Sequence, residues 1–167
     1  MNTVDKKMNS YISLYKGQVN KSDIQKTYMF LLKYVMQVKA SFEKAFSKEY
    51  SCGYVSPGYM DYSYFSCANE YLKGKRLRFG IVLNHSEMRF ELWLMGQNKE
   101  IQNSYWNLLK ASTWNQDCTT KPQYAELEIV LVDNPNFENI DTLTADIINR
   151  AIEEANRVIV YLKKLDC

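Results

Sequence analysis

The chain has few of the residues from which metal and cofactor sites are built. His85 is its only histidine, and none of its four cysteines stands in a CxxC pair. A closed zinc site needs four clustered ligands, commonly at short spacings, so no metal site is predicted. The sequence also contains no GxxxxGK(S/T), GxGxxG, GxSxG or HExxH, the motifs that cradle phosphates, expose a nucleophilic serine or hold a catalytic zinc. We therefore expect no obligatory metal or organic cofactor, and no catalytic residue is predicted.

Long hydrophobic runs and a strong charge of one sign are also absent. No apolar run approaches the roughly 18–20 residues of a membrane-spanning helix, and residues 1–7 lack the apolar region of a signal peptide. We expect a cytoplasmic protein that does not engage a membrane, with free thiols in a reducing compartment. Twenty-one basic and nineteen acidic side chains leave a net charge of +2, which is too small to indicate nucleic acid as a partner.

The chain has the length of one domain and carries two long stripes of apolar residues at helical spacing. The 167 residues contain no internal repeat and no linker-like run of Gly, Ser and Pro, so a single domain over 1–167 is predicted. Ser22-Asp23-Ile24-Gln25 is a capping box, after which apolar residues recur every three or four positions as far as Phe46. A second long stripe runs from Leu143 to Leu165 behind a cap at Asp141.

The remaining patterns predict an α+β fold, with a mostly antiparallel five-stranded sheet and the two long helices on one face. The predicted element order is α-α-β-β-β-β-α-β-α. Short helices are expected at about 5–16, where Gly17 is the stop, and after a cap at Asn98. The strand patterns, two of them in one hairpin, occupy residues 50–55, 59–67, 77–94 and 125–132, and one helical turn is expected at 69–74.

The hairpin at 77–94 gives the strongest indication of a site. When it is paired about a turn at His85-Ser86, Leu83 lies opposite Met88 and one face carries only apolar side chains. We expect the long helices on that face. The other face gathers two arginines, a carboxylate and an indole around a glycine, with Arg78 opposite Trp93, Gly80 opposite Glu91 and Val82 opposite Arg89.

This polar face is predicted to be a partly covered ligand-binding surface. Arg78 can make a cation–π contact with Trp93, worth about 0.5–2 kcal/mol, and an indole beside guanidinium groups is typical of recognition surfaces. The loop at 111–124 is expected to cover the face, with Trp114 as the lid. The candidate ligand-binding residues are Arg78, Arg89, Glu91, Trp93, Tyr62, Tyr64 and Trp114.

The favoured function is a non-enzymatic binding module for a small anionic ligand or an acidic partner segment. A solvated face laced with ion pairs is the structural alternative. A diverged nuclease-like hydrolase would use Asp61 and Glu91 to hold a divalent metal, but Trp93 stands where that chemistry needs a lysine. A platform for single-stranded nucleic acid would stack bases on Tyr62, Tyr64 and Trp93, and the near-neutral charge counts against it.

Further expectations concern association, thiols and the histidine. The helix at 22–46 is long enough to overhang a sheet of short strands, which favours a homodimer. Cys52 and Cys67 lie in neighbouring predicted strands, but their spacing leaves open whether they are adjacent. His85, at an exposed hairpin tip, is expected to serve the turn rather than catalysis.

Short motifs in the middle of the chain stand at Tyr59-Met60-Asp61, Asn84-His85, Arg89-Phe90-Glu91-Leu92-Trp93-Leu94, Gly96-Gln97-Asn98, Gln102 and Tyr105-Trp106. Together they resemble a family of small, uncharacterised bacterial proteins that is catalogued as a domain of unknown function. The run RFExWLxGxN is the most specific part, and the resemblance covers nearly the whole chain. It implies a bacterial, cytoplasmic, single-domain protein and supplies no activity, cofactor or catalytic residue.

Overall fold

The computed structural model describes residues 3–166. The chain divides into two compact units, Met1–Tyr34 and Val35–Cys167, and the single domain expected from the sequence stays a prediction. None of the helices within 3–166 combines the length and the apolar character needed to cross a membrane.

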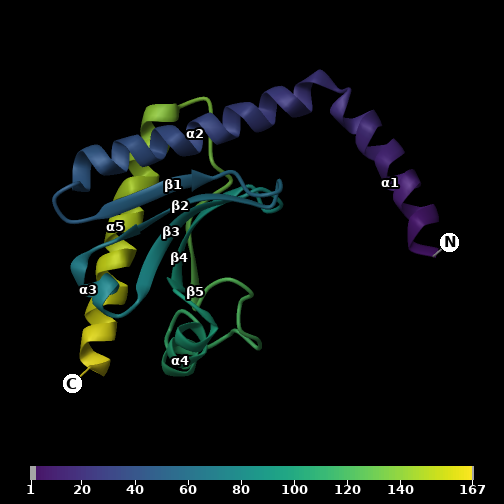
Figure 1. The fold of residues 1–167 in the computed structure, drawn as a ribbon. Coiled ribbons are helices and arrows are strands. Elements are labelled where there is room, and N and C mark those ends of the chain that lie inside the picture. The colour runs from purple at the N-terminus through teal and green to yellow at the C-terminus, as the bar shows by residue number, and fades with distance from the viewer. Residues whose placement is uncertain (1–2, 167) are drawn as a thin grey trace. The chain divides into compact units, whose positions relative to one another are not determined.

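The first unit consists of α1 (Thr3–Val19) and the beginning of α2 (Ser22–Phe46) (Figure 1). The stop predicted at Gly17 is wrong, because α1 continues to Val19. A Cβ placed at Gly17 would meet nothing within 4 Å, so this glycine lies on an open helix surface. The capping box predicted at Ser22 depends on a side chain outside those that the structure describes. Side chains from 7 to 18 are exposed, among them the apolar residues Met8, Tyr11, Ile12, Leu14 and Tyr15.

The second unit is built on a five-stranded antiparallel sheet, which confirms the predicted α+β fold. The strands follow the chain order β1-β2-β3-β4-β5 across the sheet, and each is antiparallel to the next (Figure 1). The strands are β1 (Ser51–Ser56), β2 (Tyr62–Ala68), β3 (Leu77–Asn84), β4 (Arg89–Gly96) and β5 (Leu127–Asp133).

Three further helices complete this unit. The single turn expected at 69–74 is α3 (Glu70–Gly74), and α4 (Lys99–Leu109) begins at the predicted cap, where Asn98 Oδ1 accepts a hydrogen bond from Ile101 N at 2.9 Å. The cap predicted for α5 (Ile140–Leu165) at Asp141 is wrong. Asn139 caps α5 by accepting from Thr142 N at 3.3 Å, and Asp141 lies in the first turn, where its charge complements the helix dipole.

One face of the sheet forms the core with α5 and with the part of α2 that lies in this unit. The rings of Phe42 in α2 and Phe65 in β2 have centroids 6.1 Å apart, and α5 packs along β4 and β5. The alternation of apolar residues along the hairpin therefore identified the core face correctly. Its fully buried side chains on β3 and β4 are Phe79, Ile81, Leu83, Phe90, Leu92 and Leu94.

The hairpin register differs from the predicted one by two residues. The prediction of a two-residue turn at His85-Ser86 is wrong, because four residues, His85 to Met88, connect Asn84 with Arg89. Asn84 Oδ1 accepts hydrogen bonds from Glu87 N at 3.2 Å and from Ser86 Oγ at 3.1 Å. A shift by an even number keeps every side chain on its predicted face and changes only its partner. The observed pairs are Leu83 with Phe90, Val82 with Glu91, Gly80 with Trp93, and Arg78 with Met95.

A tight turn between β1 and β2 brings a second set of side chains to the polar face. Gly58 has φ +67°, and a Cβ there would lie 2.2 Å from the Tyr62 carbonyl oxygen, so only glycine fits. Asp61 Oδ1 accepts from Tyr59 N at 2.8 Å and from Tyr62 N at 2.7 Å. These bonds hold residues 57–61 as a turn, and β2 consequently begins at Tyr62 rather than at Tyr59.

Candidate ligand-binding site

Glu91 is the buried centre of the polar face. It points away from the core helices, yet only 1% of it is exposed. Its Oε2 accepts a hydrogen bond from the Trp93 indole Nε1 at 2.6 Å, and its Oε1 accepts from Asn84 Nδ2 at 3.1 Å and from Arg89 Nε at 2.5 Å. A buried carboxylate is stable only when such donors replace its water. Glu91 therefore fixes an indole and a guanidinium and offers no free charge to a ligand.

The two arginines of the predicted site have different environments. The Arg89 side chain is 31% exposed and ion-paired with Glu91, whose hydrogen bond raises the pKa of Arg89 above its usual range. Arg78 is exposed and pairs in register with Met95, so its predicted pairing with Trp93 is wrong. Within residues 3–166 the Arg78 guanidinium has no hydrogen bond or ion pair. Arg78 is thus the cation that remains available.

Aromatic rings cover Trp93, which is 3% exposed. The Tyr62 ring meets it edge-on, with centroids 4.8 Å apart and an interplanar angle of 62°, and Tyr124 stacks on it at 6.5 Å and 12°. Tyr124 comes from the loop before β5, so that loop covers the face as expected. The lid residue was predicted wrongly, because Trp114 donates to Glu154 of α5 at 3.4 Å and meets Tyr161 at 5.5 Å.

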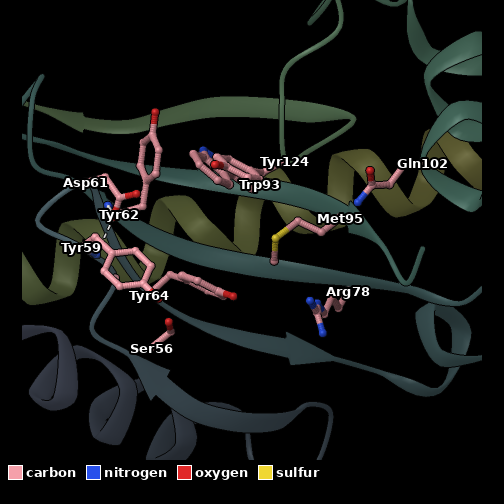
Figure 2. A pocket seen from close by; sticks show the side chains of 11 residues that line it. Ser56, Tyr59, Asp61, Tyr62, Tyr64, Arg78, Trp93, Met95, Gln102 and Tyr124 are labelled. Atoms are coloured by element: carbon pink, nitrogen blue, oxygen red, sulfur yellow. Dashed lines mark hydrogen bonds between the residues drawn. The ribbon is translucent and has the colours of Figure 1, made fainter. Parts of the chain in front are cut away.

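A cavity of about 330 Å³ opens beside these rings. Figure 2 shows Tyr59, Tyr62, Tyr64 and Asp61 toward one end and Arg78 toward the other, with Met95 between them. We call it the aromatic cavity. Four of the predicted site residues line it (Tyr62, Tyr64, Arg78 and Trp93), whereas Arg89, Glu91 and Trp114 do not. Its lining consists of Ser56, Gly58, Tyr59, Asp61, Tyr62, Tyr64, Arg78, Trp93, Met95, Gln102 and Tyr124.

The gap predicted at Gly80 lies opposite Trp93 and not opposite Glu91. A Cβ at Gly80 would come within 2.7 Å of Met95 Cε. The missing side chain therefore makes room for the thioether of Met95, which lies over the strand and lines the cavity. A methionine side chain is flexible and polarizable, so this lining can adjust to the shape of a bound ring.

Several lining residues escaped the sequence-based prediction for identifiable reasons. Met95 follows Trp93 by two positions on β4, so the same alternation would have placed it on the polar face. Gln102 on α4 and Tyr124 in the loop carry no periodic signal, because their positions depend on tertiary packing. Asn115 Nδ2 donates to the Glu126 carbonyl at 2.8 Å and helps to hold that loop against the start of β5.

The nuclease-like alternative finds no support in this geometry. A metal would need the oxygens of Glu91, and hydrogen-bond donors already occupy both. Asp61 uses its Oδ1 to cap the turn, and these backbone donors lower the pKa of the Asp61 carboxyl. In the described part of the chain, no three His, Cys, Asp or Glu side chains are grouped so as to hold a metal ion.

Ser63 and His85 form a pair that could be mistaken for a catalytic dyad. Ser63 Oγ lies 2.8 Å from His85 Nε2. The serine is completely buried, however, and its hydroxyl donates to the Pro57 carbonyl at 2.7 Å. With that proton committed, His85 donates to Ser63 Oγ, and burial lowers the pKa of His85. The pair ties the hairpin tip to the β1–β2 turn, which agrees with the structural role predicted for His85.

Glu126 is a second buried acid, just before β5. None of it is exposed, and neither carboxyl oxygen has a hydrogen-bond partner in the described residues. Burial raises the pKa of Glu126 to about 7, and the nearby Gly96 N–H, which does not meet hydrogen-bond geometry, and the Lys121 charge lower it by less. Burial without hydrogen-bond partners therefore favours the neutral acid, and the ionised form of Glu126 destabilises the fold.

We expect the Glu91→Gln variant to lose about 2–4 kcal/mol of unfolding free energy. An amide cannot accept from Trp93, Asn84 and Arg89 together, and it leaves the Arg89 cation without its counter-charge. Urea denaturation at neutral pH measures the loss. The exposed Glu87→Gln in the turn of the same hairpin is the matched control and should change stability by under about 0.5 kcal/mol. Equal effects of the two substitutions would contradict the role assigned to Glu91.

We expect Glu126 to make the protein less stable as pH rises. Its folded-state pKa of about 7 lies above the unfolded value, so its contribution is fully present below about pH 4.5 and is lost as pH rises through 7, by about 3 kcal/mol. Glu126→Gln mimics the protonated acid and should remove this decline, which urea titrations between about pH 5 and 8 would measure. The exposed Glu138→Gln is the control, and a variant with an unchanged pH dependence would refute this account.

Comparison with known proteins identifies a family but no characterised relative. A family model described as Domain of unknown function (DUF7000) matches residues 8–162. No curated protein and no solved structure gave a match. The matched range includes all five strands and every residue that lines the aromatic cavity. The chain belongs to this family, which is defined by a domain of unknown function.

Proposed function

We propose that this protein is a binding module for a small organic anion that carries a flat ring. The observation behind the proposal is Arg78, a cation without a partner among the described residues, at a cavity walled by aromatic rings. The volume of about 330 Å³ falls at the small end of the range for ligand pockets, about 300–1,000 Å³. It suits a molecule with one or two fused rings.

The chemistry of the lining supports both parts of such a ligand. Tyr64 and Tyr59 offer ring faces or edges beside the Tyr62–Trp93 pair, and stacked or edge-on contacts stabilise a bound ring by about 0.5–1.5 kcal/mol each. Arg78 can donate two parallel hydrogen bonds to a carboxylate or phosphate. Asp61, at the opposite end of the cavity in Figure 2, repels an anionic group. The charges therefore favour one orientation of the ligand.

The contacts on the polar face support a narrower proposal than the one made from the sequence, with a single arginine at the ligand. Arg89 is paired with Glu91, so one arginine and not two would contact the anion. Trp93 is covered by Tyr62 and Tyr124, which leaves little of its ring for stacking nucleic-acid bases. An acidic protein segment is the other occupant considered, and the limited volume of the cavity favours a small molecule.

The proposal is tested by binding measurements on a defined panel. Aromatic carboxylates and nucleoside monophosphates are screened by thermal shift, and hits are titrated by calorimetry beside their uncharged analogues. We expect at least one anionic compound to bind, with its neutral analogue and the Arg78→Gln variant each weaker by about 10–100-fold, as for the loss of a charged hydrogen bond.

The controls separate a specific site from general charge effects. Arg157→Gln removes the same charge from α5, away from the cavity lining, and should leave the affinity unchanged. A panel without a single hit, or an affinity that Arg78→Gln does not alter, would overturn the proposal. Tighter binding of a short polyglutamate peptide than of every small anion would assign the site to an acidic segment instead.

Self-association, a bacterial source and a cytoplasmic location stay predictions. Light scattering should give twice the chain mass at high concentration and a lower mass on dilution. A mass of one chain at every concentration would exclude the dimer.

A further inference from the structure

Cys52 and Cys67 form a pair that the proposed ligand site does not use. They are direct partners in the antiparallel ladder of β1 and β2, and both are free thiols. Facing residues in such a ladder have Cα atoms about 4.5–5.5 Å apart, and a disulfide needs about 4.4–6.8 Å. The two sulfurs can therefore be joined without a large movement of either strand.

The local backbone also favours such a link. Strand β1 lies at the edge of the sheet, where only β2 pairs with it. The register of the two strands shifts between Cys52 and Val55, so the ladder is interrupted directly after the cysteine. A shift of this kind lets one strand bend relative to its neighbour. The edge strand can thus adapt to the torsion angles of a disulfide.

The two thiols are unequal in exposure and in acidity. Cys67 is 3% exposed, whereas Cys52 is half-buried. The hydrogen bond from the Cys67 thiol lowers the pKa of Cys52, although burial and Glu43 act against it, and Lys39 supports it. The bond to Cys52 and burial raise the pKa of Cys67 well above its usual value. A reagent in solution therefore meets Cys52 first and finds it the better nucleophile.

We propose that Cys52 and Cys67 are a thiol–disulfide exchange site that forms an internal cross-link by reaction with a low-molecular-weight disulfide such as glutathione disulfide. The Cys52 thiolate attacks one sulfur of the reagent, the reagent's S–S bond breaks, and one glutathione leaves as a thiolate that takes up a proton. Cys67 then loses its proton and attacks the Cys52 sulfur of the mixed disulfide. The second glutathione leaves, so two protein thiols are oxidised and one disulfide is reduced to two thiols.

The site is distinct from a structural disulfide, since a reducing compartment returns it to the dithiol. Its position also separates it from the aromatic cavity. Cys67 shares the core face with Phe65, whereas Ser56 and Tyr64, which pair further along the same two strands, line the cavity on the other face. The thiol pair can therefore be tested without altering a residue proposed to bind ligand.

The experiment uses the full chain, equilibrated without oxygen in glutathione buffers that range from fully reduced to fully oxidised. Free thiols are then alkylated, and the peptides are mapped by mass spectrometry. We expect a Cys52–Cys67 cross-link that dithiothreitol reverses, with the loss of two alkylatable thiols and no glutathione retained on either residue. Cys118→Ser, which removes an exposed thiol outside the pair, should leave the yield of cross-link unchanged.

The single variants test the assigned roles. Cys67→Ser should retain one glutathione on Cys52, because nothing resolves the mixed disulfide, and Cys52→Ser should react at Cys67 at least about tenfold more slowly than the parent reacts at Cys52. Peptide mapping of the parent chain shows whether the Cys52–Cys67 cross-link forms, even if a variant fails to fold. A stable glutathione adduct on Cys52 beside a free Cys67, or reaction at Cys118 alone, would overturn the proposal.

Discussion

The carboxylate of Glu91 is the interaction on which the polar side of the sheet depends. A charge that is 1% exposed would be too costly to bury without donors, and three side chains of the same hairpin supply them. The bond to Trp93 Nε1 holds the indole in one orientation. The rings of Tyr62 and Tyr124 then have a fixed surface to pack on, and together these rings wall the aromatic cavity. One buried acid thus links the hairpin register to the shape of the cavity.

Glu126 is also a buried acid, but its surroundings differ from those of Glu91. Both carboxyl oxygens of Glu91 accept hydrogen bonds from surrounding donors, whereas those of Glu126 have no hydrogen-bond partner in the described residues, and burial raises the pKa of Glu126 to about 7. The two arginines of this face also differ in whether they have a charged partner. Arg89 is held by Glu91, and Arg78 is left without a counter-charge. Burial and pairing, rather than composition, decide which charged groups of this face remain available to a ligand.

The sequence predicted the fold well because the fold follows from periodicity. The long stripes of α2 and α5 and the alternation along β3 and β4 fix which faces are buried, and a two-residue error in register does not alter them. That error arose in the turn, where the Asn84 side chain stabilises a four-residue connection instead of a two-residue one. Side-chain capping of this kind has no periodic signature. The partners across the hairpin were therefore wrong although the faces were right.

The candidate site was predictable only where it lies on regular structure. Tyr62, Tyr64, Arg78 and Trp93 stand on strands, and all four line the cavity. Trp114 and Tyr124 stand in one loop without periodicity, so nothing in the sequence could decide which ring covers Trp93. The same limit applies to Cys52 and Cys67, because their adjacency depends on the register of β1 against β2, which the Pro57-Gly58 turn and the irregularity after Cys52 jointly set. The edge strand β1 and its neighbour β2 can consequently serve a ligand cavity on one face and a thiol pair on the other, since successive residues alternate between the two faces.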